Sequence, residues 1–312
     1  MKLKSTRDGF GEALLELAKK DKNIVVVDAN LKTSLRVSSF AEYCPERFIE
    51  VGVAEQNMIG VAAGLALSGK TVFTTSFACF SPAISWNNVR VSVCYSKANV
   101  KIVGSHAGLA TGADGASHQA LEDVSLMRVL PNMVVLAPAD YSQAKALTFL
   151  AAKKKGPVYL RLTRPATPII TQKSKVKSQK SKIGGSQILR KGKNLTIISY
   201  GPILSEVLKA AEVLDAEVIN CYSLKPVDKK TIVDSARKTN QVLTVEDHLV
   251  CGGVGSIVAE VLSQEKRTPL KMMKMIGVQD KFGQSGRDYK ELWQKYGLTK
   301  KIIVEEGRKM IG

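Results

Sequence analysis

Residues 47–75, RFIEVGVAEQNMIGVAAGLALSGKTVFTT, decide the fold class. The segment from Arg47 to Val51 is a candidate strand, the segment from Glu55 to Leu67 has a helical pattern, and Thr71 to Thr75 is a run rich in β-branched residues that indicates another strand. Strand, helix and strand in about 30 residues predict two parallel strands joined by a crossover helix. Such units build sheets that are covered by helices.

The same alternation extends in both directions from this unit. Further expected strands are Ile24 to Val27, Val100 to Gly104, Met133 to Ala137 and Val158 to Leu162. Further expected helices are Ala83 to Tyr95, His118 to Leu130 and Ser142 to Lys153. This order predicts a largely parallel sheet with helices on both faces.

A second α/β pattern begins near Leu195 and runs to the end of the chain. Between the two patterns, Thr171 to Lys193 holds eight basic residues and no acidic one, in a composition typical of a solvated linker. We therefore predict a domain at residues 1–165, a basic linker at 166–193 and a smaller domain at 194–312. Each domain is expected to be a mostly parallel sheet covered by helices.

Composition excludes several classes of protein. The 45% apolar content suits a globular chain, and no window holds the ~20 apolar residues of a membrane span. Five scattered cysteines without a CxxC spacing argue against a disulfide framework and a zinc site, so we expect a reducing cytoplasm. The net charge of +18 comes without interleaved aromatic residues, which disfavours nucleic acid as the partner.

Glu55 is the first residue with chemical interest, because it opens an apolar helix among small and branched residues. Burial there favours a protonated carboxyl that donates a hydrogen bond. Without further context, the better explanation of Glu55 is an acid that complements the helix dipole.

The loop from Gly104 to Gln119 carries two of the three histidines, His106 and His118, together with Asp114. Loops at the carboxyl ends of parallel strands are where open α/β sheets bind ligands, and imidazoles handle protons near neutral pH. No third ligand at a supportive spacing favours a metal site.

Phe77 and Phe80 lie where the strand that begins at Thr71 ends. Taken alone they are better explained as core residues, although an aromatic ring at a strand end can stack on a flat heteroaromatic ligand.

Together these stretches resemble transketolase over nearly the whole chain. VGVAEQNMIGVAAGLALSGK from Val51, SHAGLATGADGASHQALEDVSLMRVLPNM from Ser105 and GPVYLRLTRP from Gly156 are similar to its pyrimidine-binding domain. TVEDHLVCGGVGSIVAEVL from Thr244 and IGVQDKFGQSGRDYKELWQKYGLT from Ile276 are similar to its C-terminal domain.

The resemblance implies thiamine diphosphate as the cofactor and assigns roles to residues. Glu55 matches the glutamate that hydrogen-bonds the aminopyrimidine ring and promotes removal of the thiazolium C2 proton, while Phe80 matches the aromatic stacked on that ring. Residues implied to contact the cofactor are Glu55, Phe77, Phe80 and Asp114. Residues implied to bind a sugar phosphate are Arg7, Ser34, His106, Asp114, His118 and Arg164, of which His106 and His118 also assist proton transfer.

Two departures from the family pattern matter. Ala83 stands where many transketolases have a tyrosine against the pyrimidine. The GDG motif that holds Mg²⁺ and the diphosphate in longer members has no counterpart, since the chain offers only Ala113-Asp114-Gly115. The resemblance therefore implies a separate N-terminal subunit that carries this motif and the Mg²⁺, and an assembly that is a dimer of heterodimers.

Other interpretations stay open at this point. A 2-oxo acid dehydrogenase β subunit or a deoxyxylulose-phosphate synthase relative shares the fold, and a non-catalytic basic interaction protein could retain it. For the EDH run at Glu246 to His248 and the GGVGS turn that follows, close packing or a subunit contact is favoured over anion binding.

Overall fold

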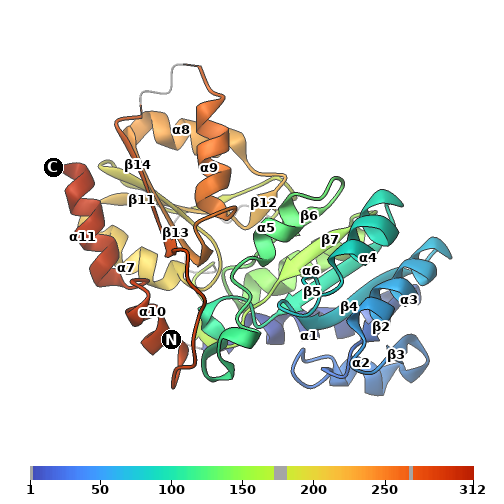
Figure 1. Cartoon of the computed structure of the whole chain (residues 1–312). Coiled ribbons are helices and arrows are strands. Elements are labelled where there is room, and N and C mark those ends of the chain that lie inside the picture. The colour runs from blue at the N-terminus through green and yellow to red at the C-terminus, as the bar shows by residue number, and fades with distance from the viewer. Residues whose placement is uncertain (1–2, 172–180, 267–269) are drawn as a thin grey trace.

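The computed structural model describes residues 3–171, 181–266 and 270–312, which build two helix-covered sheets (Figure 1). The strands of the larger sheet are β2 (Ile24–Asp28), β3 (Phe48–Glu50), β4 (Thr71–Phe77), β5 (Val100–Ser105), β6 (Val134–Leu136), β7 (Val158–Arg161) and β12 (Ser223–Lys225). Their order is β12-β6-β7-β5-β4-β2-β3, and all pairs are parallel except β12 with β6. We call the part of the chain built on this sheet the first domain.

Two helix layers bury the larger sheet, as the alternation along its strands requires. Val72 of β4 packs in the cluster that holds α3 (Glu55–Leu67) and α5 (Asp123–Arg128), whereas Phe73 packs in the cluster that holds α1 (Thr6–Lys20) and α6 (Tyr141–Lys153). β2, β5, β6 and β7 are buried along their whole length, and β2 and β6 accordingly have continuous rather than alternating apolar runs, IVVV and VVL.

Five strands form the second sheet, which we call the second domain with its helices. They are β9 (Gln187–Arg190), β10 (Leu195–Ser199), β11 (Ala216–Asn220), β13 (Gln241–Leu249) and β14 (Met272–Val278). The order is β14-β13-β10-β11-β9, with only β9 antiparallel. The helices are α7 (Leu204–Leu214), α8 (Lys229–Thr239), α9 (Val254–Ser263), α10 (Tyr289–Lys295) and α11 (Lys300–Ile311). The predicted two-domain α/β class is confirmed. Within the described residues, no helix is both long and apolar enough to span a bilayer.

Two strands lie inside the segment 166–193 that the sequence predicts as a linker. β8 (Ala166–Pro168) pairs with β1 (Leu3–Ser5), and β9 joins the second sheet beside β11. The Lys/Ser-rich centre, residues 172–180, lies outside the described residues. The strand sequences at both ends are too short and too polar for local pattern to separate them from linker.

Two predicted helices are shorter than expected. Instead of one helix from Ala83 to Tyr95, the chain forms α4 (Trp86–Asn88) followed by a π-helix, Val89–Tyr95. Of the helix predicted from His118 to Leu130, only α5 forms, starting at Asp123, because His118 itself ends the second of two preceding 3-10 helices, Leu109–Asp114 and Ala116–His118. Gly108, Gly112 and Gly115 all have positive φ angles there, which ends regular helix.

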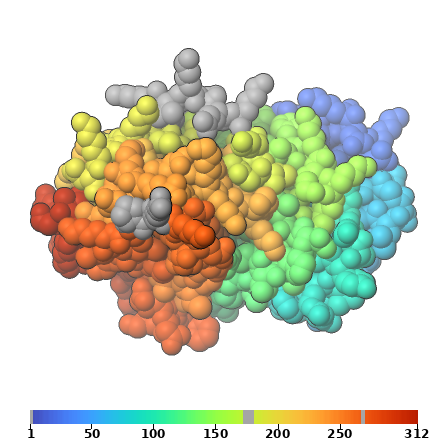
Figure 2. Space-filling view, turned by 90° about the horizontal axis from the view of Figure 1, so that it is seen from above, coloured from blue at the N-terminus to red at the C-terminus, as the bar shows by residue number. Residues whose placement is uncertain are grey.

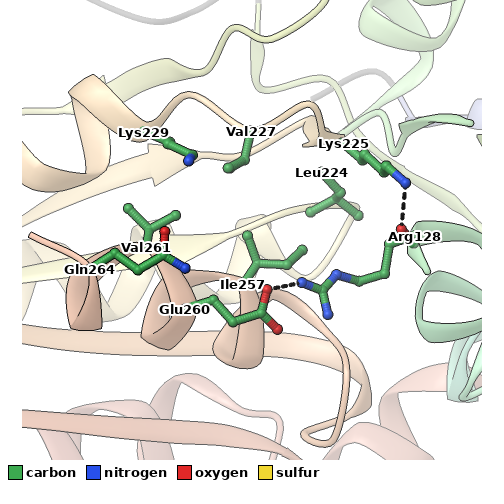
Figure 3. Close-up of a pocket in the computed structure, with 9 residues that line it drawn as sticks. All are labelled: Arg128, Leu224, Lys225, Val227, Lys229, Ile257, Glu260, Val261 and Gln264. Atoms are coloured by element: carbon green, nitrogen blue, oxygen red, sulfur yellow. Dashed lines mark hydrogen bonds and ion pairs between the residues drawn. The ribbon is translucent and has the colours of Figure 1, made fainter. Parts of the chain in front are cut away.

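The two domains share a broad boundary, seen from above as yellow-to-red atoms against green ones (Figure 2). β12 comes from the second pattern in the sequence but extends the first sheet. A groove of about 220 Å³ lies beside it, and Figure 3 shows the residues that line this groove. Arg128 pairs with Glu260 across this groove, and Lys225 Nζ donates to the backbone oxygens of Arg128 and Leu130. Both cations are thus occupied, and the groove is part of the domain boundary because Glu260, the partner of Arg128, belongs to α9 of the second domain.

Candidate active site

The carboxyl ends of β3, β4 and β5 bring together the groups that the sequence singled out. Glu55 opens α3 after β3 and is 7% exposed. Its Oε1 accepts a hydrogen bond from Ser76 Oγ of β4 at 3.1 Å. Glu55 therefore does more than complement a helix dipole, because its carboxylate also contacts the carboxyl end of β4.

Four rings gather at the same edge of the sheet, where β4 and β5 end. Phe77 and Phe80 are stacked with ring centroids 5.7 Å apart and planes at 21°. The ring of His106 lies 3.8 Å from that of Phe77, and His118 meets the edge of Phe80 at 5.3 Å. The structure thus brings together both histidines and both aromatic residues that the sequence predicted.

His106 lies at the end of β5 and is 3% exposed. Its φ angle of 56° is in a region that non-glycine residues rarely adopt and that recurs at functional sites. Burial first, and then the positive charges of Arg7 and Arg164, lower the pKa of the imidazole to about 3. The Nδ1 atom lies 2.8 Å from Ser105 Oγ. The ring is therefore neutral at physiological pH, and it can share a proton with a bound hydroxyl without carrying a charge.

Arginines lie near His106. Arg7 donates to the backbone oxygens of Ser34 (2.6 Å) and Arg164 (2.7 Å), and Arg164 donates to Thr111 O (2.8 Å) and lies 3.3 Å from Asp114 Oδ1. Burial, then the charge of Arg36 and more weakly that of Arg164, lower the pKa of Arg7 to about 10. Arg7, Ser34 and Arg164, which were predicted to lie at the phosphate of the substrate, are thus close together, and the carbonyl of Ser34 accepts a hydrogen bond from Arg7.

Sequence reasoning missed Asp28, at the carboxyl end of β2. Burial, with the nearby Glu50 adding to it, raises the pKa of Asp28 to about 6, although Thr75 Oγ1 and the Leu31 amide donate hydrogen bonds to it. Its position directly after the IVVV run, at the edge where the other site residues lie, is the signal that could have identified it. Cys79, by contrast, is not activated, because burial raises the pKa of its thiol to about 12.

Comparison with known proteins decides the family. The model of the transketolase pyrimidine-binding domain matches residues 2–169, and that of the transketolase C-terminal domain matches residues 184–303. The chain belongs to the transketolase family.

Relatives of full length point to the split form of transketolase. The chain is 45% identical to a putative transketolase C-terminal section of Methanocaldococcus jannaschii, over 98% of this chain and 97% of that protein. It is 42% identical to a 6-deoxy-6-sulfo-D-fructose transketolase subunit of Clostridium sp. (strain MSTE9), over 96% and 92%. A solved split-gene transketolase, an inactive β4 tetramer, matches with a TM-score of 0.88 and 43% identity over 98% of both chains. The chain is thus a C-terminal subunit of the split-transketolase type.

Transketolases use thiamine diphosphate and a divalent metal, and the residues at this edge of the sheet fit one end of that cofactor. Ser76 is the one hydrogen-bond donor to the Glu55 carboxyl among the described residues, which leaves the other oxygen for a ring nitrogen, and the Phe77–Phe80 pair offers an aromatic face. No cluster of three or more histidine, cysteine or acidic side chains suited to a metal occurs within the described ranges. The fit is therefore to the aminopyrimidine end.

We expect His106 to stay neutral in the isolated chain down to about pH 5, because its pKa is lowered from 6.5 to about 3. The unfolded chain binds this proton below about pH 6.5 and the folded chain does not, so the stability that the neutral ring contributes is lost as pH falls from 6.5 towards 3. Proton NMR of the histidine Cε1–H signals, with His106→Asn to assign the resonance and the urea-unfolded chain as the reference, measures this. Titration of the assigned signal above about pH 5.5 would contradict the expectation.

Proposed function

We propose that this chain is the C-terminal subunit of a thiamine-diphosphate-dependent transketolase, which transfers a two-carbon ketol unit from a ketose phosphate to an aldose phosphate. The observation that carries the proposal is the meeting of a buried carboxyl, a stacked aromatic pair and two histidines at one edge of the sheet. The first two suit the cofactor's pyrimidine, and the histidines suit a polyhydroxylated substrate.

Each of these residues has a distinct role in the proposed reaction. Thiamine diphosphate, when bound, supplies the carbon that takes up the ketol unit and the ring that stores its electron pair. Glu55 holds a proton against the pyrimidine nitrogen, and Phe80 with Phe77 keeps that ring in place. His106 and His118 exchange protons with the hydroxyls of the sugar, and Asp114 lies at the rim where cofactor and sugar meet.

A cation cluster suits the anionic end of the sugar. Arg7 donates hydrogen bonds to the backbone oxygens of Ser34 and Arg164, and Arg164 in turn pairs with Asp114. The Nε atom of Arg7 is buried without a hydrogen-bond partner among the described residues. Planar guanidinium groups bind the tetrahedral oxygens of a phosphate or a sulfonate in the same way. The sulfo-sugar named for the Clostridium relative has a sulfonate group, so a site for an anionic group does not by itself identify the sugar.

The other half of the cofactor requires a second chain. We infer an N-terminal subunit with a GDG motif that holds the diphosphate and Mg²⁺, in an assembly that pairs two heterodimers. Large apolar side chains that are between 46% and 84% exposed support such an assembly. They lie on α3, on the segment before it and on the α4–π-helix region, and they are Val53, Leu67, Ile84, Val91 and Tyr95. The free cysteines support a reducing compartment, the cytoplasm.

Mixing this chain with its candidate N-terminal subunit, thiamine diphosphate and Mg²⁺ tests the proposal. With xylulose 5-phosphate and ribose 5-phosphate as substrates, we expect a seven-carbon ketose phosphate to form in the mixture and in neither chain alone. A stable, cofactor-loaded complex that transfers no ketol unit would contradict the proposal. It would favour a 2-oxo acid dehydrogenase type of activity or a non-catalytic role.

A further inference from the structure

The loop that carries His106, Asp114 and His118 is held from the second domain. Asp247 of β13 reaches across the domain boundary, where its Oδ1 accepts from Leu109 N at 2.8 Å and its Oδ2 from Ala110 N at 3.1 Å. Trp293 Nε1 of α10 donates to the same Oδ2 at 3.0 Å. These two backbone amides begin the 3-10 helix Leu109–Asp114 and have no acceptor inside it.

Local geometry is built around this carboxylate. Gly108 has a φ angle of 80°, and a Cβ atom there would come within 2.6 Å of Asp247 Oδ2. Only glycine permits both the backbone angle and the approach of the carboxylate. Asp247 is 5% exposed, and a charge-assisted hydrogen bond in such surroundings is stronger than one in water.

The turn held by Asp247 continues directly into the pocket. Thr111, next after Ala110, donates its hydroxyl to His106 O, and its own backbone oxygen accepts from Arg164 Nη1 at 2.8 Å. A shift of this turn therefore moves the backbone of the buried histidine and the guanidinium at the same time. Asp247 itself belongs to the domain boundary and contacts neither of the two side chains.

The far end of the loop has its own anchor in the second domain. Gln119 Nε2 donates to Gly112 O at 3.2 Å and to Gln284 O at 2.9 Å. A Cβ atom on Gly283 would come within 1.8 Å of Gln119 Oε1, so the segment after β14 packs directly on this side chain. Both ends of the loop from His106 to Gln119, which we call the substrate loop, are thus fixed by residues of the second domain.

We propose that Asp247 is a positioning residue, through which the second domain holds His106 and Arg164 in the geometry that binds the anionic sugar. This proposal rests on the proposed function for its kinetic consequence. The two neighbouring acids of the EDH run accordingly have different roles. Glu246 accepts from the amides of Val254 and Gly255 at the start of α9, while Asp247 serves the substrate loop.

Asp247→Asn tests the proposal, with Asp140→Asn as the matched control. The asparagine keeps the shape but replaces one charged acceptor by an NH₂ group that faces amide donors. Asp140 is an equally buried carboxylate that accepts from the amides of Gln143, Ile170 and Thr171, and it does not contact the loop. The control therefore reports the general cost of losing a buried carboxylate.

The first measurement is amide hydrogen exchange of the isolated chain, followed in peptides that cover residues 105–120. We expect exchange there to be about tenfold faster in Asp247→Asn and unchanged in Asp140→Asn. This readout needs neither the partner nor the activity, so it stands even if the proposed function fails.

The second measurement is steady-state kinetics of the assembled enzyme. We expect Asp247→Asn to raise KM for the sugar phosphate about tenfold and to lower kcat severalfold, because misplacement of binding groups costs about 100-fold at most. A merely structural role would lower the active fraction and leave KM unchanged. If Asp247→Asn does not fold, Thr111→Val removes the next link, the bond to His106 O, and the same rise in KM is expected. Unchanged exchange and KM, or equal effects of the two asparagine variants, would overturn the proposal.

Discussion

Replacement of Glu55 by glutamine is expected to lower ketol transfer by the assembled enzyme about 1,000-fold. Glutamine keeps the size of the side chain and can still accept the hydrogen bond from Ser76, but it cannot give up and take back a proton. In the proposed reaction that proton, held by the carboxyl oxygen that Ser76 leaves free, sets the state of the pyrimidine ring. The variant should fold normally, because glutamine fills the same space and keeps the hydrogen bond from Ser76.

The measurement is kcat of the mixed subunits at saturating thiamine diphosphate, with cofactor affinity determined separately by calorimetry. Ser76→Ala is the matched control, since it removes the hydrogen bond at Oε1 and leaves the carboxyl in place. We expect that control to lose only about tenfold. A Glu55→Gln enzyme with more than about a tenth of normal kcat and normal cofactor affinity would show that this carboxyl transfers no essential proton.

The parts of the site that could be predicted from the sequence are those set by local pattern. Parallel strands end at one edge of a sheet, so residues that directly follow a predicted strand gather there whatever the strand order. Glu55, Phe77 and His106 all meet this condition: Phe77 contacts His106, and Glu55 accepts a hydrogen bond from Ser76, the residue before Phe77. Arg7 and Arg164 were inferred from family resemblance alone, since nothing in their local sequence separates them from surface arginines.

The parts that could not be predicted depend on contacts between distant segments. Leu109 and Asp247 are 138 residues apart, and no periodicity signals that one holds the other. β12 extends the first sheet although its sequence belongs to the second pattern, and a strand of three residues carries too little local information to be recognised. The helix predicted from His118 begins only at Asp123, because His118 ends the 3-10 helix Ala116–His118, which follows Gly115 with its positive φ angle.

The buried ion pair between Asp123 and Arg161 is where we expect the largest effect on stability. Asp123 of α5 is fully buried, and its carboxylate accepts from Arg161 Nε at 2.9 and 3.1 Å and from Tyr159 OH at 2.6 Å. Arg161 continues across the domain boundary, where its Nη2 donates to Asp247 O at 3.0 Å and its guanidinium lies over the ring of Tyr200. The pair therefore connects the first sheet to the second domain.

Asp123→Ala is expected to lower the free energy of unfolding by about 3–5 kcal/mol, because it leaves the guanidinium of Arg161 buried without its counter-ion. Urea denaturation followed by circular dichroism measures this loss as a lower midpoint. Glu260→Ala is the matched control, since it breaks the exposed pair with Arg128 at the same boundary, and a loss below about 1 kcal/mol is expected there.

Replacement of both partners, Asp123→Leu with Arg161→Met, separates the cost of an unpaired charge from the worth of the pair itself. With no charge left to bury, the double variant should recover much of the stability that Asp123→Ala loses. The double variant also loses the hydrogen bond that Arg161 donates to Asp247 O. Amide hydrogen exchange in residues 105–120 should therefore be faster even where global stability recovers. If the double variant is no more stable than Asp123→Ala, the loss arises from packing rather than from charge, and the pair does not connect the domains electrostatically.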